Sequence, residues 1–381
     1  MVRILHIIRP AAGGMKQHLL DLAGGLPSDD FVVAVAGPDG DAGLSQEIEA
    51  LGLKYYPVDI TGPLKPGKDI KCILDLYKLI KNYKFDIIHC HGSKAGLIGR
   101  LAAWMAGSPV IIVTVHNFVV YEEVPLVKRF LFTGGEKFLS SRTTGIITVS
   151  RALKKEMTQI FGIPDHKITA IYNGIDLERF RNIPDQATLR KKYGISAHKP
   201  VVGTVARMAP QKGLAYFIDA AALLVREGCQ GKFMIVGDGP LRPELEAQAA
   251  RLGLADRLIF TGYQAEIIPF LKLFDVFVTP SIAEGLSITT IEAMAAGKAV
   301  VASAVGGLPE LVKSEDNGLL VTPRDAQAMA KAIGTLLDRP GVCDRMGQSG
   351  MRMVKADFSK DMMVGKTADF YRYCMKKGNI I

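Results

Sequence analysis

Short, almost wholly apolar runs recur along this chain and are separated by segments of helix length, and this pattern limits the possible folds more than any other feature. Strands that are apolar on both faces are typical of parallel sheets covered by helices on both sides. The predicted strands of the first half are Val2–Ile8, Phe31–Ala36, Ile87–Cys90, Val110–Val115, Ile146–Val149 and Ile168–Tyr172. Those of the second half are Val201–Val205, Phe233–Val236, Leu258–Phe260, Val276–Val278, Ala299–Ala302 and Leu319–Val321. We therefore predict an α/β protein with two Rossmann-like domains.

The break between the two halves is rich in charged and turn-forming residues. A chain of 381 residues also has the length of two average domains. We predict a first domain over residues 1–175, an interdomain linker over 176–197 and a second domain over 198–355. A helical pattern over 359–377 follows the second domain.

The composition excludes several classes of protein. Hydrophobic residues make up 48% of the chain and charged residues 22%, which excludes a disordered protein. The net charge of +9 is too small to indicate nucleic acid as a partner. The five cysteines are scattered and form no CxxC pair, which argues against disulfides and a zinc site. This cysteine usage favours a reducing, cytoplasmic compartment.

Residues 101–121 carry no Asp, Glu, Lys or Arg over about the length of a membrane span. The sequence Gly107-Ser108-Pro109 interrupts this stretch, so we interpret it as the end of a buried helix followed by a buried strand. The apolar run at the start of the chain ends at Arg9-Pro10 and is too short for a signal peptide.

Ligands of open parallel sheets bind beyond the carboxyl ends of the strands, and the candidate residues of the first half follow predicted strands. Gly13 and Gly14 precede a helix, where backbone amides can approach an anion; a plain tight turn is the alternative. Neither a dinucleotide fingerprint nor a Walker pattern is present. His116 is a candidate hydrogen-bonding or acid–base group in an interdomain cleft, or an ordinary polar strand end. His89 and His91 share one face of a strand but lack an obvious third ligand, so we predict no metal site.

Two further loops of the second half follow strands. Arg207 and Lys212 come after the strand 201–205, in a loop that leads into a helix. Two cations at this position could bind a diphosphate, and they could equally be solvated surface residues. Gly237 and Gly239 come after the strand 233–236. The residues of this loop are typical of a plain turn, and the same residues could also lie beneath a nucleotide.

Two carboxylates seven residues apart form the sharpest motif. Glu284 lies in the loop after the strand 276–278, and Glu292 lies about two turns into the next helix. A carboxylate can accept hydrogen bonds from two sugar hydroxyls, and the helix start beside Leu286 and Ser287 offers free amides to an anion. The segment around Glu292 is otherwise apolar, and a buried carboxylate needs partners.

Together these motifs resemble the retaining glycosyltransferases of family 4, which have the GT-B fold. The segment EGLSITTIEAMAAG over 284–297 resembles the donor-binding signature of that family, with its two glutamates spaced by seven. The supporting matches are Gly13-Gly14, His116, Asn173-Gly174-Ile175-Asp176, Arg207, Lys212-Gly213, Gly237-Asp238-Gly239 and Gly306-Gly307-Leu308-Pro309-Glu310. The first half matches only in short pieces, as expected of a variable acceptor domain.

The resemblance implies a donor site for a nucleoside-diphosphate sugar in the second domain and an acceptor site in the first. Arg207 and Lys212 would neutralise the diphosphate leaving group. Glu292 would bind the ribose hydroxyls and Glu284 those of the donor sugar. Uridine is the base we expect, from its frequency in the family.

The remaining implied roles concern backbone and the first domain. The amides of Gly285, Leu286 and Ser287 would lie near the donor, and Gly13 and Gly14 near phosphate and acceptor. His116 would contact the donor sugar near the reacting carbon. The family also implies retention of the anomeric configuration, no divalent metal or other cofactor, and a terminal helix over 359–381 that returns to the first domain. Asp39-Gly40-Asp41 formally matches an Asp-x-Asp metal pattern, but it lies in a Gly/Asp-rich stretch after the second strand, and we interpret it as a turn.

Basic residues beside apolar ones in the first domain favour a resting surface on an anionic membrane. These residues are the stretch 126–132 and four lysines of the predicted helix 68–83, namely Lys68, Lys71, Lys78 and Lys81. A helix face that is simply exposed to solvent would have the same lysine pattern. The matching acceptor is a glycan or a lipid-linked one, in cell-surface polysaccharide or glycolipid synthesis at the inner membrane face. A nucleotide-sugar epimerase and a non-catalytic nucleotide-sugar binding protein are the competing functions.

Overall fold

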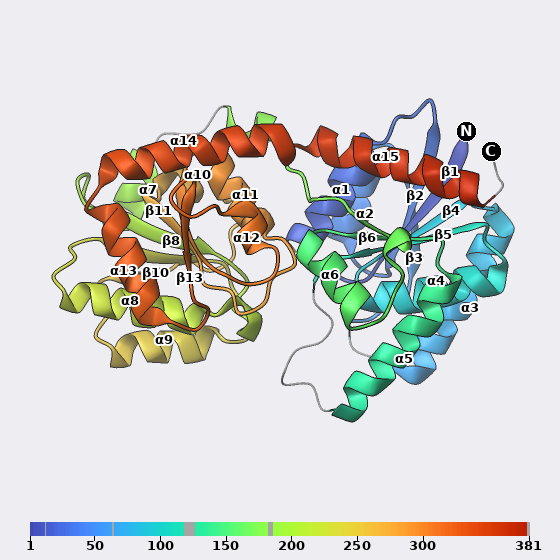
Figure 1. Ribbon diagram of the computed structural model, residues 1–381, viewed down its shortest axis with the longest axis horizontal. Coiled ribbons are helices and arrows are strands. Elements are labelled where there is room, and N and C mark those ends of the chain that lie inside the picture. Colours follow the sequence, from blue (N-terminus) through green and yellow to red (C-terminus); the bar gives the residue numbers. More distant parts are fainter. Residues whose placement is uncertain (12, 63–64, 118–125, 182–185, 379–381) are drawn as a thin grey trace. The chain divides into compact units, whose positions relative to one another are not determined.

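The computed structural model describes residues 1–11, 13–62, 65–117, 126–181 and 186–378. The chain divides into two compact units (Figure 1). The first comprises Met1–Gly174 together with Lys360–Ile381, and the second comprises Ile175–Ser359. Each unit is an α/β domain built on one parallel sheet, as predicted.

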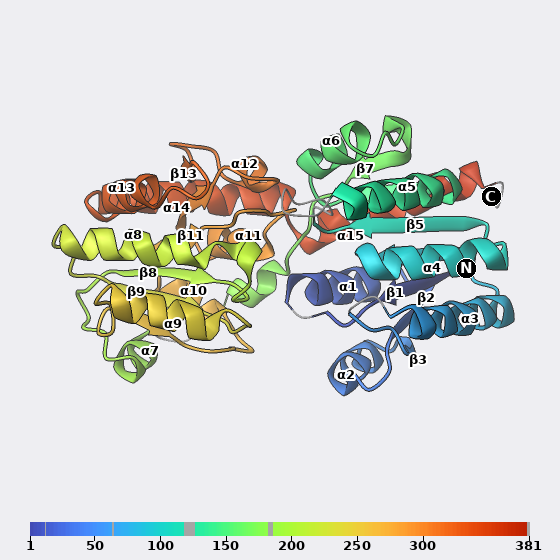
Figure 2. The same cartoon turned by 90° about the horizontal axis from the view of Figure 1, so that it is seen from below.

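The first unit holds a seven-stranded sheet in the order β3-β2-β1-β4-β5-β6-β7. Its strands are β1 (Val2–Ile8), β2 (Phe31–Pro38), β3 (Lys54–Val58), β4 (Ile87–His91), β5 (Val110–Val115), β6 (Gly145–Thr148) and β7 (Ile168–Ala170). Its helices are α1 (Gly14–Gly25), α2 (Ala42–Ala50), α3 (Pro66–Tyr83), α4 (Ser93–Ala106), α5 (Leu126–Arg142), α6 (Arg151–Gln159) and α15 (Lys360–Lys377). Figure 2, seen from below, shows α3, α4 and α5 along one face of this sheet.

The terminal helix α15 belongs to the core of the first unit, although it follows the whole second unit in the sequence. It packs beside α1 and buries Met363, Tyr371 and Cys374 among the apolar residues of β1 and β2. The phenolic hydroxyl of Tyr371 lies 2.5 Å from His89 Nδ1, which ties the helix to β4. The expected return of the terminal helix to the first domain is therefore present.

The second unit holds a six-stranded sheet in the order β10-β9-β8-β11-β12-β13. Its strands are β8 (Val201–Val205), β9 (Lys232–Val236), β10 (Leu258–Phe260), β11 (Val276–Thr279), β12 (Ala299–Ser303) and β13 (Gly318–Val321). Its helices are α7 (Ala187–Lys192), α8 (Leu214–Arg226), α9 (Arg242–Arg251), α10 (Ile268–Leu273), α11 (Ile288–Ala295), α12 (Leu308–Leu311), α13 (Ala326–Leu337) and α14 (Pro340–Asp357). Both sheets reverse their strand order beside a central strand, β1 or β8, and such a reversal is where open α/β sheets bind ligands.

The boundary between the units differs from the prediction. The chain crosses from one unit to the other between Gly174 and Ile175. The segment 176–197, which we assigned to a linker, belongs to the second unit, where α7 packs against α10. The described residues of this segment therefore belong to the second unit and do not form a separate linker.

The apolar runs correspond to strands of the structure to within two residues at either end. Strand β3 was not predicted, because Lys54 and Pro57 interrupt its pattern at the edge of the sheet. The uncharged stretch from residue 101 forms the end of α4 and then β5, as we expected, and residues 118–121 lie outside the described part. Within the described residues, no helix is both long and apolar enough to cross a membrane.

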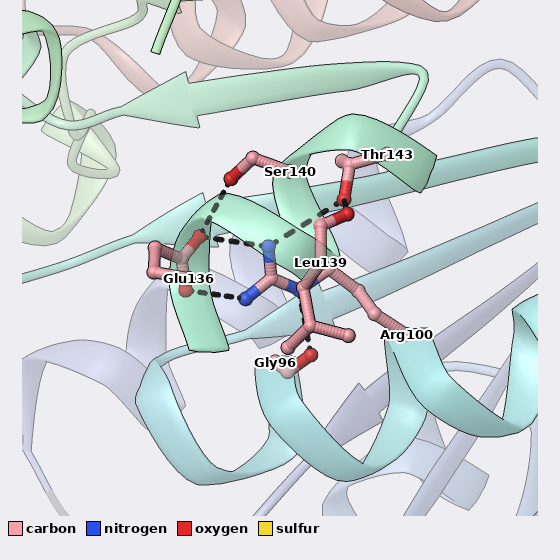
Figure 3. A network of polar contacts seen from close by, with 6 residues as sticks. All are labelled: Gly96, Arg100, Glu136, Leu139, Ser140 and Thr143. Atoms are coloured by element: carbon pink, nitrogen blue, oxygen red, sulfur yellow. Dashed lines mark hydrogen bonds and ion pairs between the residues drawn. The ribbon is translucent and has the colours of Figure 1, made fainter. Parts of the chain in front are cut away.

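One buried ion pair joins α4 to α5 in the first unit (Figure 3). The Arg100 guanidinium donates to both carboxylate oxygens of Glu136, at 2.8 and 2.7 Å. Its Nε donates to the Gly96 carbonyl at 2.7 Å, and Ser140 donates to Glu136 at 3.0 Å. The pair therefore fastens two helices of the layer that covers the sheet.

Candidate functional site

The strand reversal of the second unit carries an ion pair of different character. Lys212 ends a short 3₁₀ turn after β8, and Glu284 lies in the loop after β11. The Lys212 ammonium lies 2.5 Å from Glu284 Oε2, and the Ser281 hydroxyl donates to the same oxygen at 3.1 Å. Glu284 is buried, whereas about a quarter of the Lys212 side chain is exposed (24%). The pair thus places opposite charges in the wall of a small pocket.

Backbone contacts interlock the two loops that carry this pair. Gly213 has a φ of +60°, and a Cβ there would lie 2.1 Å from the Pro280 carbonyl oxygen, so only glycine fits. The amide of Ile282 donates to the Gln211 carbonyl at 2.8 Å. The spacing of Lys212 and Glu284 is therefore set by the backbone.

The start of α11 forms the floor of the same pocket. The Ser287 side chain caps the helix by accepting from the Thr290 amide at 3.2 Å, and Gly285 and Leu286 are buried beside it. The positive end of the helix dipole at this first turn attracts negative charge. The pocket is lined by Thr204, Val205, Ala206, Lys212, Thr279, Pro280, Ser281, Glu284, Ser287 and Thr289. Its hydroxyls, amides and one cation suit a ligand with both phosphate and hydroxyl groups.

Glu292 is buried in α11, as the apolar surroundings in the sequence predicted. It is the fifth residue of the helix, nearer the N-terminus than the two turns we expected. Arg179 Nη1 lies 3.8 Å from its carboxylate, and the same guanidinium pairs with Glu266 at 3.1 Å. Sequence reasoning missed Arg179, because it lies far away in the segment that we assigned to the linker.

Arg207 and the two loop glycines have different environments. The Arg207 side chain is exposed and has no ion pair with any carboxylate of the described residues. A Cβ at Gly237 would lie 2.1 Å from the Ala206 carbonyl oxygen, and one at Gly239 would lie 2.5 Å from that of Met208. The close packing of these loops therefore already accounts for both glycines, whether or not a nucleotide lies over them.

The strand reversal of the first unit is lined by neutral groups instead. Gly13 precedes α1 with a φ of +66°, and Gly14 is the first residue of that helix. No atom of the described residues lies within 4 Å of a Cβ built at Gly13, so its conformation alone explains the glycine. His116 follows β5, and burial lowers its pKa well below the usual range, with His18 and Arg9 acting in the same direction. His116 is therefore neutral near pH 7 and suits hydrogen bonding better than proton donation.

Asp41 confirms the interpretation of Asp39-Gly40-Asp41 as a turn. Its side chain caps α2 by accepting from the Leu44 amide at 3.1 Å. The carboxylate is thus engaged in starting a helix, as is usual for an aspartate at this position.

Two family models together match most of the chain. Residues 12–179 match "Glycosyltransferase Family 4", and residues 199–339 match "Glycosyl transferases group 1". The first match lies on the first unit and the second match on the second unit, except for a few residues at the boundary.

Characterised relatives match over nearly the full chain. A UDP-Gal:alpha-D-GlcNAc-diphosphoundecaprenol alpha-1,3-galactosyltransferase of Escherichia coli is 30% identical and covers 97% of this chain and 96% of its own. A GDP-mannose-dependent alpha-(1-6)-phosphatidylinositol monomannoside mannosyltransferase of Mycobacterium tuberculosis is 32% identical, with 95% of each chain covered. The structure of Anabaena HepE in complex with UDP-glucose has a TM-score of 0.86 at 25% identity and covers 98% of this chain and 100% of HepE.

Proposed function

The chain belongs to glycosyltransferase family 4 and is a glycosyltransferase, and on that premise we propose that it transfers a sugar from a UDP-sugar to a lipid-linked or glycan acceptor. The product would enter cell-surface polysaccharide or glycolipid. The names of the two relatives, one acting on a diphosphoundecaprenol and one on a phosphatidylinositol mannoside, support a lipid-linked acceptor. HepE, which binds UDP-glucose, supports the uridine nucleotide, whereas the mycobacterial relative uses GDP-mannose.

The observation that carries the donor site is the Lys212–Glu284 pair beside the capped start of α11. We assign Lys212 and the exposed Arg207 to the diphosphate, whose negative charge grows as the bond to the anomeric carbon breaks. When the diphosphate draws Lys212 to itself, Glu284 becomes available to accept hydrogen bonds from sugar hydroxyls. The amides of Gly285, Leu286 and Ser287 would complete the anion site.

Glu292 and His116 take the remaining roles. We assign the buried Glu292 carboxylate to the ribose hydroxyls, with Arg179 beside it to orient it. The neutral His116 would hydrogen-bond the donor sugar near the reacting carbon. Gly237 and Gly239 would line the nucleotide, and Gly13 and Gly14 the phosphate and acceptor. The transfer would retain the anomeric configuration, so the acceptor oxygen bonds the face of the carbon that the diphosphate leaves, and it would need no divalent metal.

Two glutamate variants separate the assigned roles. Glu292→Ala should weaken binding of UDP and of the UDP-sugar alike, because both carry the ribose. Glu284→Ala should leave UDP binding nearly unchanged and weaken only the sugar-dependent part. Calorimetric titration of both ligands measures this, with the exposed Glu244→Ala on α9 as the control. Equal losses of UDP affinity in the two variants would contradict the assignment.

The base and the sugar are tested by thermal shift against UDP, GDP, ADP, CDP and NAD and the common sugar conjugates. A ligand at 100 times its dissociation constant stabilises the folded state by about 2.7 kcal/mol, which is easily measured. We expect a selective shift with UDP. A shift with GDP alone would replace the proposed base, and a shift with NAD alone would contradict the donor site.

We further propose that the first unit rests on an anionic membrane at the cytoplasmic face. Lys68, Lys71, Lys78 and Lys81 are exposed on α3, and Ile70 and Leu74 are exposed on the same helix. Basic and apolar side chains together suit a lipid headgroup region. The side chains of residues 126–132, which the sequence also suggested, lie outside the described part. Each of the five cysteines is a free thiol, in keeping with a reducing compartment.

Liposome flotation tests this surface. We expect salt-sensitive binding to anionic vesicles, and a clear loss of binding in Lys71→Glu/Lys78→Glu. The matched control reverses the charge of two lysines of the second unit in Lys232→Glu/Lys331→Glu. This control should still bind to anionic vesicles. Absence of binding to anionic vesicles at low salt would refute the membrane proposal.

A further inference from the structure

Five of the seven histidines of this chain gather in one cluster of the first unit. His6 lies in β1, His89 and His91 in β4, His18 in α1, and His116 directly after β5. All are buried except His116, which is partly exposed. The sequence indicated only the pair in β4, and the fold brings the other three rings to it.

The deeper set consists of His6, His89 and His91, and it is His89 whose two ring nitrogens are both engaged in hydrogen bonds, whereas His6 Nε2 has no partner among the described residues. His89 Nδ1 lies 2.5 Å from the Tyr371 hydroxyl and His89 Nε2 lies 2.7 Å from that of Thr114. Both nitrogens of His89 are therefore used in holding α15 and β5 to β4. This set is part of the core of the unit and leaves no lone pair on His89 for an ion.

The outer set, His18, His91 and His116, has a different geometry. One ring nitrogen from each of the three lies within 4.8 Å of the others. His116 Nε2 and His91 Nδ1 are 3.4 Å apart, longer than an ordinary hydrogen bond. Two nitrogens at about 2.0–2.1 Å from a tetrahedral zinc ion are separated by about 3.4 Å. Among the described residues, neither nitrogen of the buried His18 makes a hydrogen bond of ordinary geometry, although the Asn173 side chain lies near the ring.

The hydrogen bonding around the outer set also suits a metal ligand. The other nitrogen of His91, Nε2, lies 2.9 Å from His6 Nδ1, and such a second contact orients the ring of a ligating histidine.

We propose that His18, His91 and His116 form a binding site for a divalent transition-metal cation of the Zn²⁺ class, with a fourth position open to water or an anion. Three imidazoles without a carboxylate select Zn²⁺, Co²⁺, Ni²⁺ or Cu²⁺ over Mg²⁺ and Mn²⁺. The partly exposed His116 ring is the side from which an ion enters. Bound metal occupies a ring nitrogen of His116, the residue that we assign to the donor sugar, so the ion inhibits transfer; this second part rests on the proposed function.

Co²⁺ titration of the full chain, without substrate, tests the site. We expect one equivalent to bind with the intense visible absorption of four-coordinate Co²⁺, and Zn²⁺ to displace it. His18→Phe should lower the affinity at least tenfold. The control His166→Gln/His198→Gln, which removes the two exposed histidines outside the cluster, should bind as the native chain does. Absence of the absorption, its persistence in His18→Phe, or its loss in the control would each overturn the site.

Two additions keep the test decisive. His18→Gln replaces His18→Phe if the larger ring disturbs the fold, and the fluorescence of the single tryptophan, Trp104 in α4, reports whether the first unit is folded. In a transfer assay, Zn²⁺ should inhibit the native chain reversibly and leave the residual activity of His18→Gln unaffected. Inhibition that is equal in both would overturn the inhibitory role. If no transfer is found at all, the proposed function fails, and the Co²⁺ titration still decides the metal site.

Discussion

Two ion pairs in this protein have similar chemistry but opposite surroundings. In the first unit, Arg100 and Glu136 meet through two parallel hydrogen bonds, and Arg100 is only 4% exposed. In the second unit, Lys212 and Glu284 meet through one contact, and the lysine reaches toward solvent. In the first pair the cation is the buried member and Glu136 is partly exposed, whereas in the second pair Glu284 is buried and the partly exposed Lys212 lines a pocket.

The difference teaches which charges hold the fold and which are available to a ligand. A guanidinium fixed by Glu136, Gly96 and Thr143 cannot leave without exposing buried groups. In the proposed donor site, the Lys212 ammonium, held by one carboxylate, would turn to the diphosphate, and Glu284 would then accept hydrogen bonds from sugar hydroxyls. Matched substitutions in the two pairs test this distinction, and we order them by their expected effect on the free energy of unfolding.

The largest loss of stability should follow Glu136→Gln. Removing one charge from a buried pair leaves the other uncompensated, which costs about 3–5 kcal/mol, and we expect the lower end because Glu136 is partly exposed (21%). Urea unfolding followed by Trp104 fluorescence reports on the first unit. Circular dichroism is recorded in parallel, because Trp104 lies one helical turn from Arg100 and its fluorescence can respond to the substitution itself. A loss below about 1 kcal/mol would mean that the pair does not fasten α4 to α5.

Tyr371→Phe should have the next largest effect. It removes the hydroxyl that contacts His89 Nδ1 and leaves a buried polar atom unpaired, which costs about 1–3 kcal/mol. The same unfolding measurement applies, and Tyr373→Phe, on the exposed side of α15, is the control. If both variants are equally stable, the polar link between α15 and β4 contributes nothing, and only apolar packing holds the terminal helix.

Glu284→Gln should change the free energy of unfolding by about 1 kcal/mol or less, because the freed Lys212 can be solvated. Transfer, in contrast, should fall about 100-fold, as expected when a charged group of a catalytic site is removed. Circular dichroism and a sugar-transfer assay measure the two effects. A large loss of stability with intact transfer would make this pair structural, like Arg100–Glu136, and the contrast between the units would disappear.

Arg372→Ala should have the smallest effect. Its guanidinium contacts Asp30 at 2.6 Å, but both side chains are nearly half exposed. Exposed pairs contribute about 0–1 kcal/mol, and high salt screens them further. The difference in the free energy of unfolding from the native chain should therefore be at most about 1 kcal/mol in 0.1 M salt and smaller still in 1 M salt. If the free energy of unfolding fell nearly as much as in Glu136→Gln, the geometry of an ion pair, and not its burial, would determine its contribution to the stability of this protein.

The predicted strands could be found in the sequence because each is a short apolar run. Glu284 could be named as a candidate because it follows one of these runs, and ligands of parallel sheets bind beyond the carboxyl ends of strands. Strand β3 was missed, since an edge strand with Lys54 and Pro57 is half solvated and lacks the apolar signal. The segment 176–197 was misplaced for a related reason, because a charged surface covering a domain has the composition of a linker.

The amino-acid sequence by itself determined the two parallel sheets, the loops that follow their strands and the two glutamates at fixed spacing, because these depend on residues near each other in the chain. Only the tertiary structure decided which distant side chains meet. His6 lies against His91 although 85 residues separate them. Arg179 lies beside Glu292 although it precedes the whole second sheet in the sequence. Local patterning specifies where a strand begins and ends, but the partner of a buried ring or carboxylate depends on how the strands are ordered in the sheet and on the packing of the helices that cover it.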